Sequence, residues 1–288
     1  MYVASYDPGT LSVINSSTNS VSSVIDLGFP GSSWDVAFDP ANGYVYVGEA
    51  ENPFTSVVNT TSKTVVKNIV VGDDLFTGDS DDRPNGIAYD ATNQDIYVAI
   101  YGMDSLADTN SDTLSVMKNV NLGTTEGLWD VAYNPSNGYL YASNVYTDAV
   151  YVLNGVTDSN VASIAVQRSP DGIAVDTDVG QYYGDVFVAN DASNSVSVIN
   201  ASSNSIITTI NVGENPNGIA FDPATGNFYV ANDGGDTVSV INPSTYSVIK
   251  TISVGSDPSC IAYDPANGDI YVTDFGSASV SVISPELL

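Results

Sequence analysis

Residues 217–255 read NGIAFDPATGNFYVANDGGDTVSVINPSTYSVIKTISVG and contain four short runs rich in Val, Ile, Thr and aromatic residues. The runs span 218–221, 228–231, 237–241 and 247–254, and turn-forming Asp, Pro, Asn and Gly residues separate them. Four short antiparallel strands in succession are typical of one blade of a β-propeller. The four strands of a unit are called A, B, C and D below.

Strand B recurs seven times as Tyr-Val-Ala or a near variant, and the last two intervals are both 42 residues. Repeats of about 40 to 50 residues indicate stacked or circular arrays. In six units, 26 residues separate the strand B aromatic from the residue that ends strand D, so the length of B, C and D is constant. We therefore predict an all-β, seven-bladed β-propeller of four-stranded antiparallel blades, with little helix, as a single domain over residues 1–288.

The first and last units are incomplete. We find seven B runs and seven C runs, but only six A runs and six D runs. The N-terminal unit lacks strand A, and the C-terminal unit lacks strand D. A six-bladed ring is an alternative in which residues 20–27 complete the last blade, but residues 2–15 would then be surplus. We favour seven blades.

Several segments carry a family resemblance. Residues 229–232 (YVAN), 271–274 (YVTD) and 187–190 (FVAN) resemble the signature of YVTN-family β-propeller repeats, and 216–220 (PNGIA) and 170–174 (PDGIA) fit the preceding strand. The resemblance covers almost the whole chain. It implies a propeller like those of archaeal surface-layer proteins and other cell-surface proteins, and it implies no activity.

The charge is lopsided. The chain has 34 Asp and Glu but only 6 Lys and Arg, for a net charge of −28. This charge repels phosphate backbones, so we exclude nucleic-acid binding. We find no membrane-spanning stretch and no signal peptide. Because most of the charge is lost below about pH 4, where carboxylates protonate, we expect an acidic or otherwise harsh extracellular setting. The alternative is that the charge only keeps the surface soluble.

The residue inventory limits the chemistry. The chain has no His and one Cys, Cys260, so Ser-His, Cys-His and His-metal sites and an intrachain disulfide are excluded. We therefore expect a protein that is not an enzyme.

One connection from strand D to strand A stands out. It runs from Gly72 to Ala88 and holds five aspartates, and three of them, Asp79, Asp81 and Asp82, offer hard oxygen ligands for Ca²⁺. The alternative is a solvated acidic loop. This candidate Ca²⁺ site is the one cofactor that the sequence suggests.

Two tryptophans open strand A in the units on either side of this loop. Trp34-Asp35 and Trp129-Asp130 replace the Asn-Gly or Asp-Gly found at this place in other units. We predict that Trp34, Asp35, Trp129 and Asp130 form a ligand-binding platform for sugar or peptide. The alternative is that each Trp fills space near the propeller channel.

The hairpins between strands C and D carry another pattern. Asn15, Asn59 and Asn200 each begin an Asn-X-Ser/Thr acceptor sequence for N-glycosylation, and all three fall at this hairpin. The segment from Asp108 to Asp112 resembles the opening of a calcium loop. The constant spacing places its Asn110 at the same hairpin, so we interpret it as a turn.

We predict a non-catalytic cell-surface or secreted propeller, archaeal and extracellular, that acts as a structural or adhesive module. Its partners would be other surface proteins, further copies of itself or glycans. Two alternatives are a metal-assisted lyase or hydrolase that uses the acidic loop, and a glycan-binding propeller that uses the tryptophan face.

Overall fold

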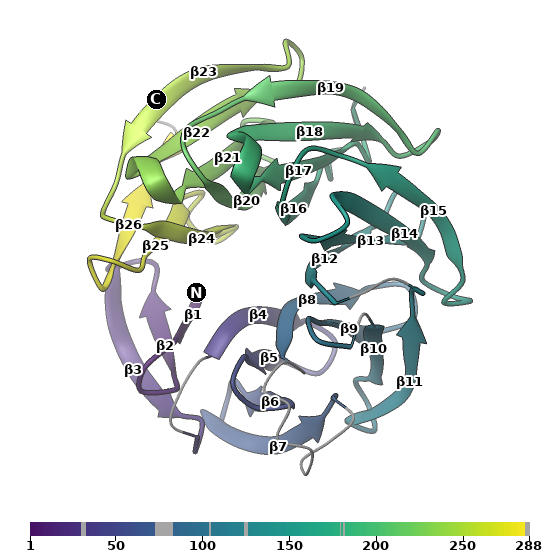
Figure 1. Ribbon diagram of the computed structural model, residues 1–288. Coiled ribbons are helices and arrows are strands. Elements are labelled where there is room, and N and C mark those ends of the chain that lie inside the picture. Colours follow the sequence, from purple (N-terminus) through teal and green to yellow (C-terminus); the bar gives the residue numbers. More distant parts are fainter. Residues whose placement is uncertain are drawn as a thin grey trace. The chain divides into compact units, whose positions relative to one another are not determined.

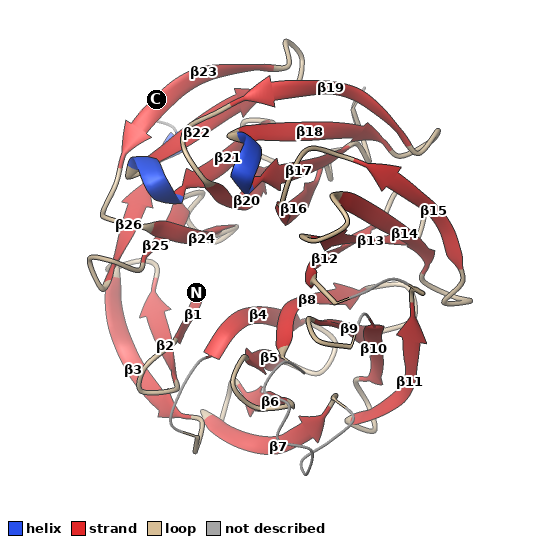
Figure 2. Ribbon diagram, in the orientation of Figure 1, coloured by secondary structure: helices blue, strands red, loops and turns tan. Residues whose placement is uncertain are grey.

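The computed structural model describes residues 1–29, 33–72, 83–103, 105–123, 126–178, 180 and 182–285. In these residues the chain forms 26 strands and two 3₁₀ turns, and the strands make seven antiparallel sheets (Figures 1 and 2). Five sheets have four strands, and the first and last have three. The predicted architecture of seven blades, with the first and last incomplete, is confirmed.

The chain divides into two compact units, each described by itself. Unit 1 comprises residues 1–133 and 154–160, and unit 2 comprises residues 134–153 and 161–288. The single domain over residues 1–288 stays a prediction. No helix among the described residues has the length and apolar character needed to cross a membrane.

The first four sheets follow the chain in order, and each strand pairs with the next. The first sheet holds β1 (Tyr2–Ser5), β2 (Thr10–Asn15) and β3 (Ser20–Asp26). The second holds β4 (Ser33–Asp39), β5 (Tyr44–Glu49), β6 (Phe54–Asn59) and β7 (Thr64–Val70). The third holds β8 (Pro84–Asp90), β9 (Asp95–Ile100), β10 (Ser105–Asn110) and β11 (Ser115–Asn121). The fourth holds β12 (Leu128–Asn134), β13 (Tyr139–Asn144), β14 (Ala149–Asn154) and β15 (Asn160–Ala165).

The last three sheets repeat the plan. The fifth holds β16 (Pro170–Val175), β17 (Val186–Asn190), β18 (Ser195–Asn200) and β19 (Ser205–Asn211). The sixth holds β20 (Pro216–Asp222), β21 (Asn227–Asn232), β22 (Thr237–Asn242) and β23 (Ser247–Ser253). The seventh holds β24 (Pro258–Tyr263), β25 (Ile270–Asp274) and β26 (Ser279–Ile283). The 3₁₀ turns are η1 (Asp191–Ser193) and η2 (Asp233–Gly235).

The turns between strands A and B follow from their sequences. The Asp222 carboxylate accepts a hydrogen bond from the Ala224 amide at 2.8 Å, and Gly226 closes the turn with a φ of 70°. Asp39 and Gly43 repeat this arrangement in unit 1, where the Asp39 carboxylate accepts a hydrogen bond from the Ala41 amide. Short acidic side chains mimic a backbone turn in this way, and glycine accepts a positive φ without steric cost.

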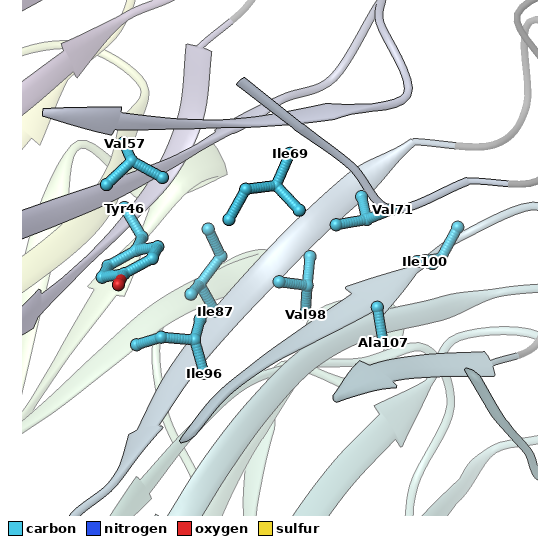
Figure 3. Close-up of a cluster of buried hydrophobic side chains, with 9 residues drawn as sticks. All are labelled: Tyr46, Val57, Ile69, Val71, Ile87, Ile96, Val98, Ile100 and Ala107. Atoms are coloured by element: carbon cyan, nitrogen blue, oxygen red, sulfur yellow. The ribbon is translucent and has the colours of Figure 1, made fainter. Parts of the chain in front are cut away.

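The two faces of the third sheet are different. On one face of β9, Ile96, Val98 and Ile100 are fully buried and pack against Tyr46 and Val57 of the second sheet (Figure 3). Successive side chains of a strand point to opposite faces. Asp95 and Tyr97 therefore lie on the other face, which belongs to the polar cluster described below.

A bulge near the start of strand A positions the first of the predicted tryptophans, Trp34. Ser33 pairs with Glu49 and Val36 pairs with Val47, so Trp34 and Asp35 together stand opposite the single residue Gly48. A bulge of this kind bends the strand and redirects its side chains. The same shift occurs in β8, β16, β20 and β24.

Candidate functional site

The structure brings the two predicted tryptophans together in unit 1. The ring centroids of Trp34, in β4, and Trp129, in β12, lie 6.0 Å apart with an interplanar angle of 85°. Tyr101 packs edge to face on Trp129 at 5.9 Å, and Tyr6 packs on Trp34 at 6.2 Å. We call these four rings, Tyr6, Trp34, Trp129 and Tyr101, the aromatic row. Edge-to-face pairs stabilise such a row beyond the area that they bury.

The aromatic row remains partly open to solvent and has charged groups at its ends. Tyr6 is 40% exposed, and the other three rings are half-buried. The Tyr6 hydroxyl donates a hydrogen bond to the Glu51 carboxylate at 3.2 Å, and this bond raises the pKa of Tyr6. The Arg83 guanidinium lies 5.8 Å from the centroid of the Tyr101 ring, within the range of a cation–π contact.

The two aspartates predicted to bind ligand, Asp35 and Asp130, accept hydrogen bonds from backbone amides. One Asp35 carboxylate oxygen accepts the Val36 amide at 2.7 Å, and the other accepts the Ile87 amide of β8 at 2.8 Å. Burial raises the pKa of Asp35 to about 6, although both backbone bonds favour the charged form. In β12, Asp130 accepts the Val131 amide at 2.7 Å. Asp35 thus links β4 to β8, and a role for either aspartate in ligand binding stays a prediction.

Position 86 requires glycine because the backbone of Asp130 and Val131 lies very close to it. A Cβ at Gly86 would lie 2.5 Å from the Asp130 Cα and 2.8 Å from the Val131 amide nitrogen. Both distances are shorter than non-bonded carbon contacts, so only glycine fits.

The sequence predicted the tryptophans of the aromatic row but missed its tyrosines. Tyr6 and Tyr101 both stand four residues after the strand B aromatic, at Tyr2 and Tyr97. This shared position places them at the start of the loop between strands B and C. The register that aligned the two tryptophans would also have aligned these tyrosines.

The predicted calcium site has no structural description. Asp79, Asp81 and Asp82 lie outside the described residues. Within the described ranges, no group of three or more Cys, Asp or Glu residues is arranged to hold a metal ion. Ca²⁺ binding by the acidic loop stays a prediction.

The three predicted glycosylation residues end strand C of their sheets, at β2, β6 and β18. The Asn15 and Asn59 side-chain oxygens accept amides at 2.9 Å, from Ser17 and Thr61. The Asn200 side-chain oxygen accepts the Ser203 amide at 3.0 Å. Each asparagine therefore shapes a hairpin turn, and its glycosylation stays a prediction.

Asn110 also ends strand C, of the third sheet. Its side-chain oxygen accepts the Thr113 amide at 2.9 Å. This bond places Asn110 at the hairpin, as interpreted, but Asp108 and Thr109 belong to β10 and the turn itself spans residues 111–114.

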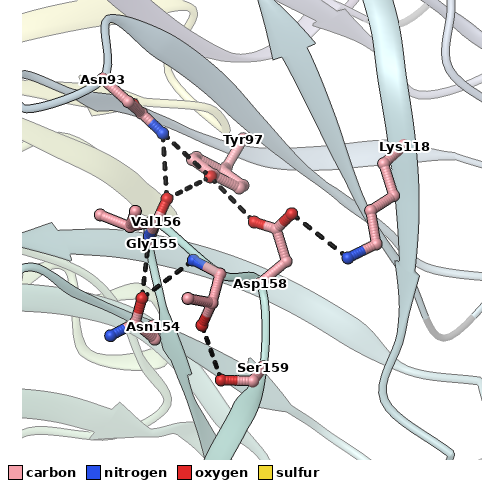
Figure 4. Close-up of polar contacts among 9 residues, drawn as sticks. Asn93, Tyr97, Lys118, Asn154, Gly155, Val156, Asp158 and Ser159 are labelled. Carbon is pink, nitrogen blue, oxygen red and sulfur yellow. Dashed lines mark hydrogen bonds and ion pairs between the residues drawn. The ribbon is translucent and has the colours of Figure 1, made fainter.

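The structure also shows a polar cluster around the buried Asp108 that the sequence did not single out, and Figure 4 shows three of its residues, Tyr97, Lys118 and Asp158. Asp108, in β10, is only 5% exposed and pairs across the sheet with Tyr97 in β9 and Lys118 in β11. The Tyr97 hydroxyl lies 2.8 Å from the Gly155 carbonyl oxygen and 3.1 Å from the Asp158 carboxylate. Lys118 pairs with Asp158 at 3.3 Å. We call Tyr97, Asp108, Lys118 and Asp158 the polar seam.

The pKa of the Asp108 carboxyl is raised well above the value usual for aspartate. Its Oδ1 atom is buried and has no hydrogen-bond partner within the described part of the chain. Burial, and then the negative charges of Asp95 and Asp158, raise the pKa of Asp108 to about 7, while the positive charge of Lys118 lowers it. A buried carboxyl without a partner favours its neutral form.

A signal for the polar seam was present in the sequence. Asp108 stands 11 residues after the strand B aromatic of its repeat. The other six sequence repeats have Val at this place: Val13, Val57, Val152, Val198, Val240 and Val282. Asp108 is therefore the one residue at this repeat position that is not Val, and this difference marks the third sheet as the place of a polar site.

The fold defines the class of protein: the chain is a β-propeller repeat protein. Residues 256–283 match the NHL repeat family. Hydrazine synthase of Kuenenia stuttgartiensis has a similar structure, with a TM-score of 0.76 and 17% sequence identity over 98% of this chain and 91% of that chain. At this identity, the likeness shows the fold alone. No curated protein matches the sequence.

Proposed function

We propose that the protein is a non-catalytic interaction module of the cell exterior that binds glycans at the aromatic row. The observation that carries the proposal is the contact of Trp34 with Trp129, extended by Tyr6 and Tyr101 and left partly open to solvent. Partly exposed aromatic rings offer large apolar faces with little entropy to lose, which suits the apolar faces of sugar rings. The Glu51 carboxylate, next to Tyr6, supplies a hydrogen-bond acceptor for sugar hydroxyls.

The charge of the chain narrows the ligand class. A net charge of −28 disfavours anionic ligands, so we expect neutral or cationic glycans to bind rather than sulfated or sialylated ones. The resemblance of the repeats to those of archaeal surface-layer proteins supports an extracellular, archaeal setting and a structural or adhesive role.

The buried acids support an acidic setting. Burial raises the pKa of Asp35 and of Asp185 to about 6, and that of Asp108 to about 7. Each group contributes most to stability below its unfolded pKa, near 3.9, and this contribution is lost as pH rises through the folded value. We expect the melting temperature to be higher at pH 4 to 5 than at pH 8. A steep loss of stability below pH 4 would argue against an acidic habitat.

A glycan array followed by calorimetry tests the binding function. We expect the wild-type protein to bind at least one neutral or cationic glycan, and Trp34→Ala and Trp129→Ala each to weaken that binding about tenfold or more. Phe275→Ala is the matched control, because Phe275 is 63% exposed and outside the aromatic row. The proposal fails if no glycan binds, or if both tryptophan variants bind as the wild type does.

The metal-assisted lyase or hydrolase that uses Asp79, Asp81 and Asp82 is a weaker candidate, since the chain has no His to act as a ligand or a general base. Measurement of bound metal, together with a hydrolase and lyase screen, tests it.

A further inference from the structure

A repeated polar contact links three of the sheets to the sheet that follows each along the chain. In this contact, a side-chain amide in the turn between strands A and B donates a hydrogen bond to a backbone carbonyl oxygen in the next C–D hairpin. The pairs are Asn42 with Ser111, Asn93 with Gly155 and Asn137 with Ala201. The fifth sheet cannot repeat this contact, because Tyr183 stands at the place of the asparagine.

Two tyrosines meet at this place in unit 2. Tyr182 lies in the turn between β16 and β17, and Tyr246 lies in the hairpin between β22 and β23. Their ring centroids are 5.8 Å apart, and the interplanar angle is 78°. Both side chains are half-buried. Because the rings are nearly perpendicular and neither is fully covered, parts of two aromatic faces border one corner that solvent reaches. We call Tyr182 and Tyr246 the tyrosine pair.

The turn that carries Tyr182 is fixed at its C-terminal end. The buried Asn134 side-chain amide donates a hydrogen bond to the Gly184 carbonyl oxygen at 2.7 Å. The Gly184 amide donates to the Asp176 carbonyl oxygen at 2.8 Å, and the Asp185 amide donates to the Tyr182 carbonyl oxygen at 2.8 Å. Tyr182 is therefore positioned before a ligand arrives, so binding at its ring costs little free energy of ordering.

A buried carboxylate gives the tyrosine pair a negative environment. Asp185 is 6% exposed, and its Oδ1 atom accepts a hydrogen bond from the Asn200 side-chain amide at 3.4 Å. Burial and then the negative charge of Asp176 raise the pKa of Asp185 to about 6, so this group is ionised at neutral pH. Burial and then the negative charge of Asp185 raise the pKa of Tyr246. The charge of Asp185 therefore acts at the tyrosine pair.

These features favour an organic cation without N–H groups. A cation is attracted by the faces of aromatic rings and by a nearby carboxylate. Asp185 is buried and already accepts an amide, so it supplies charge and not an open acceptor for a hydrogen bond. A quaternary ammonium group has no N–H to satisfy, and its methyl groups cover aromatic faces. The net charge of −28 also favours cationic ligands.

We propose that the tyrosine pair, together with Asp185, binds a small organic cation that carries a quaternary ammonium group. The two rings contact the methyl groups of the cation, and the Asp185 carboxylate stabilises its positive charge. This site lies within unit 2 and shares no residue with the aromatic row, so it is independent of the glycans proposed to bind there.

Titration with choline, followed by NMR of a protein with labelled tyrosine rings, tests the proposal. We expect the Tyr182 and Tyr246 signals to shift, with a Kd of about 1 mM or below. The uncharged analogue of choline, in which carbon replaces the nitrogen, should bind about tenfold more weakly because it has the same shape without the charge. Ethanolamine keeps a charge but has a primary ammonium group, and it should also bind more weakly than choline.

Variants of the protein separate the rings from the carboxylate. Tyr182→Ala and Tyr246→Ala should each weaken choline binding about tenfold. Tyr182→Phe keeps the ring and should retain binding, which separates loss of the aromatic face from loss of the fold. Asp185→Asn keeps an acceptor for the Asn200 amide but removes the charge, and it should weaken binding. Tyr146→Ala is the matched control, because Tyr146 is 60% exposed in the loop after β13, and it should leave binding unchanged.

Four results would overturn the proposal. Choline could produce no shift at up to about 10 mM, or its uncharged analogue could bind as tightly as choline does. Asp185→Asn or Tyr182→Ala could bind choline as the wild type does, or Tyr182→Phe could lose binding as Tyr182→Ala does. A glycan array without a bound glycan would count against the aromatic row alone, because the choline titration reports on different residues.

Discussion

The third and fifth sheets have the same strand plan but differ in what equivalent faces hold. In the fifth sheet, Phe187 pairs with Val198 and stacks on Phe228 of the sixth sheet, with centroids 3.8 Å apart. In the third sheet, Tyr97 and Asp108 take the equivalent positions and form the polar seam. The comparison shows that a repeat keeps its strand geometry while one contact surface changes from apolar to ionisable.

The largest expected effect comes from moving the acid into the apolar sheet. Val198→Asp should lower the free energy of unfolding by about 4 to 5 kcal/mol at pH 8, because it buries a charge among Phe187, Ile210 and Phe228. The loss should be smaller at pH 4, where the new carboxyl is neutral. Urea unfolding at both pH values measures it, with the exposed Val24→Asp as the control. A loss below about 1 kcal/mol would show that the fifth sheet accepts an acid as the third does.

The reverse change should stabilise the third sheet. Because the folded pKa of Asp108, about 7, is above its unfolded value of about 3.9, the native state loses stability as pH rises between these values. Asp108→Val should therefore stabilise the protein by up to about 4 kcal/mol at pH 8, and by much less at pH 4.

Asp108→Asn is the control for this change, since it cannot ionise but remains polar. Urea unfolding from pH 4 to pH 8 should show a smaller pH dependence in both variants than in the wild type. An unchanged pH dependence would mean that Asp108 is already ionised across this range.

The comparison also separates what the sequence predicts from what it does not. Turn residues such as Asp222 and Gly226, with alternating Val and Ser, were sufficient to predict strands and blades because each signal acts locally. The contact of Trp34 with Trp129 was predictable because both occupy one repeat position in nearby units. The pKa of Asp108 was not predictable, since it depends first on burial and then on neighbouring charges, among them Asp158, a residue 50 positions away whose approach only the packed structure defines.

Close backbone contacts should affect the two sheets alike. A Cβ at Gly172, in the fifth sheet, would lie 2.5 Å from the Asn217 carbonyl oxygen, and Gly86, in the third, meets the Asp130 backbone. Gly86→Ala and Gly172→Ala should each cost about 1 to 3 kcal/mol, as expected for overpacking. Thermal unfolding measures both, and Ala at Gly180, with only a side-chain atom 3.8 Å away, is the control. A cost in one sheet only would show that their backbones are packed differently.

The smallest expected effect concerns the lysine of the polar seam. The Lys118 side chain is 51% exposed, so its ion pair with Asp158 contributes less than about 1 kcal/mol, and Lys118→Gln should change stability by no more than this. Its positive charge lowers the pKa of Asp108, so the same variant should raise that pKa, as a carbon-detected NMR titration of the Asp108 carboxyl would show. Thr208→Gln, at the equivalent place in the fifth sheet, faces Val198 and should leave the Asp108 titration unchanged. If Lys118→Gln leaves the pKa of Asp108 unchanged or lowers it, the lysine does not act on the buried acid, and burial with the neighbouring carboxylates alone determines its protonation.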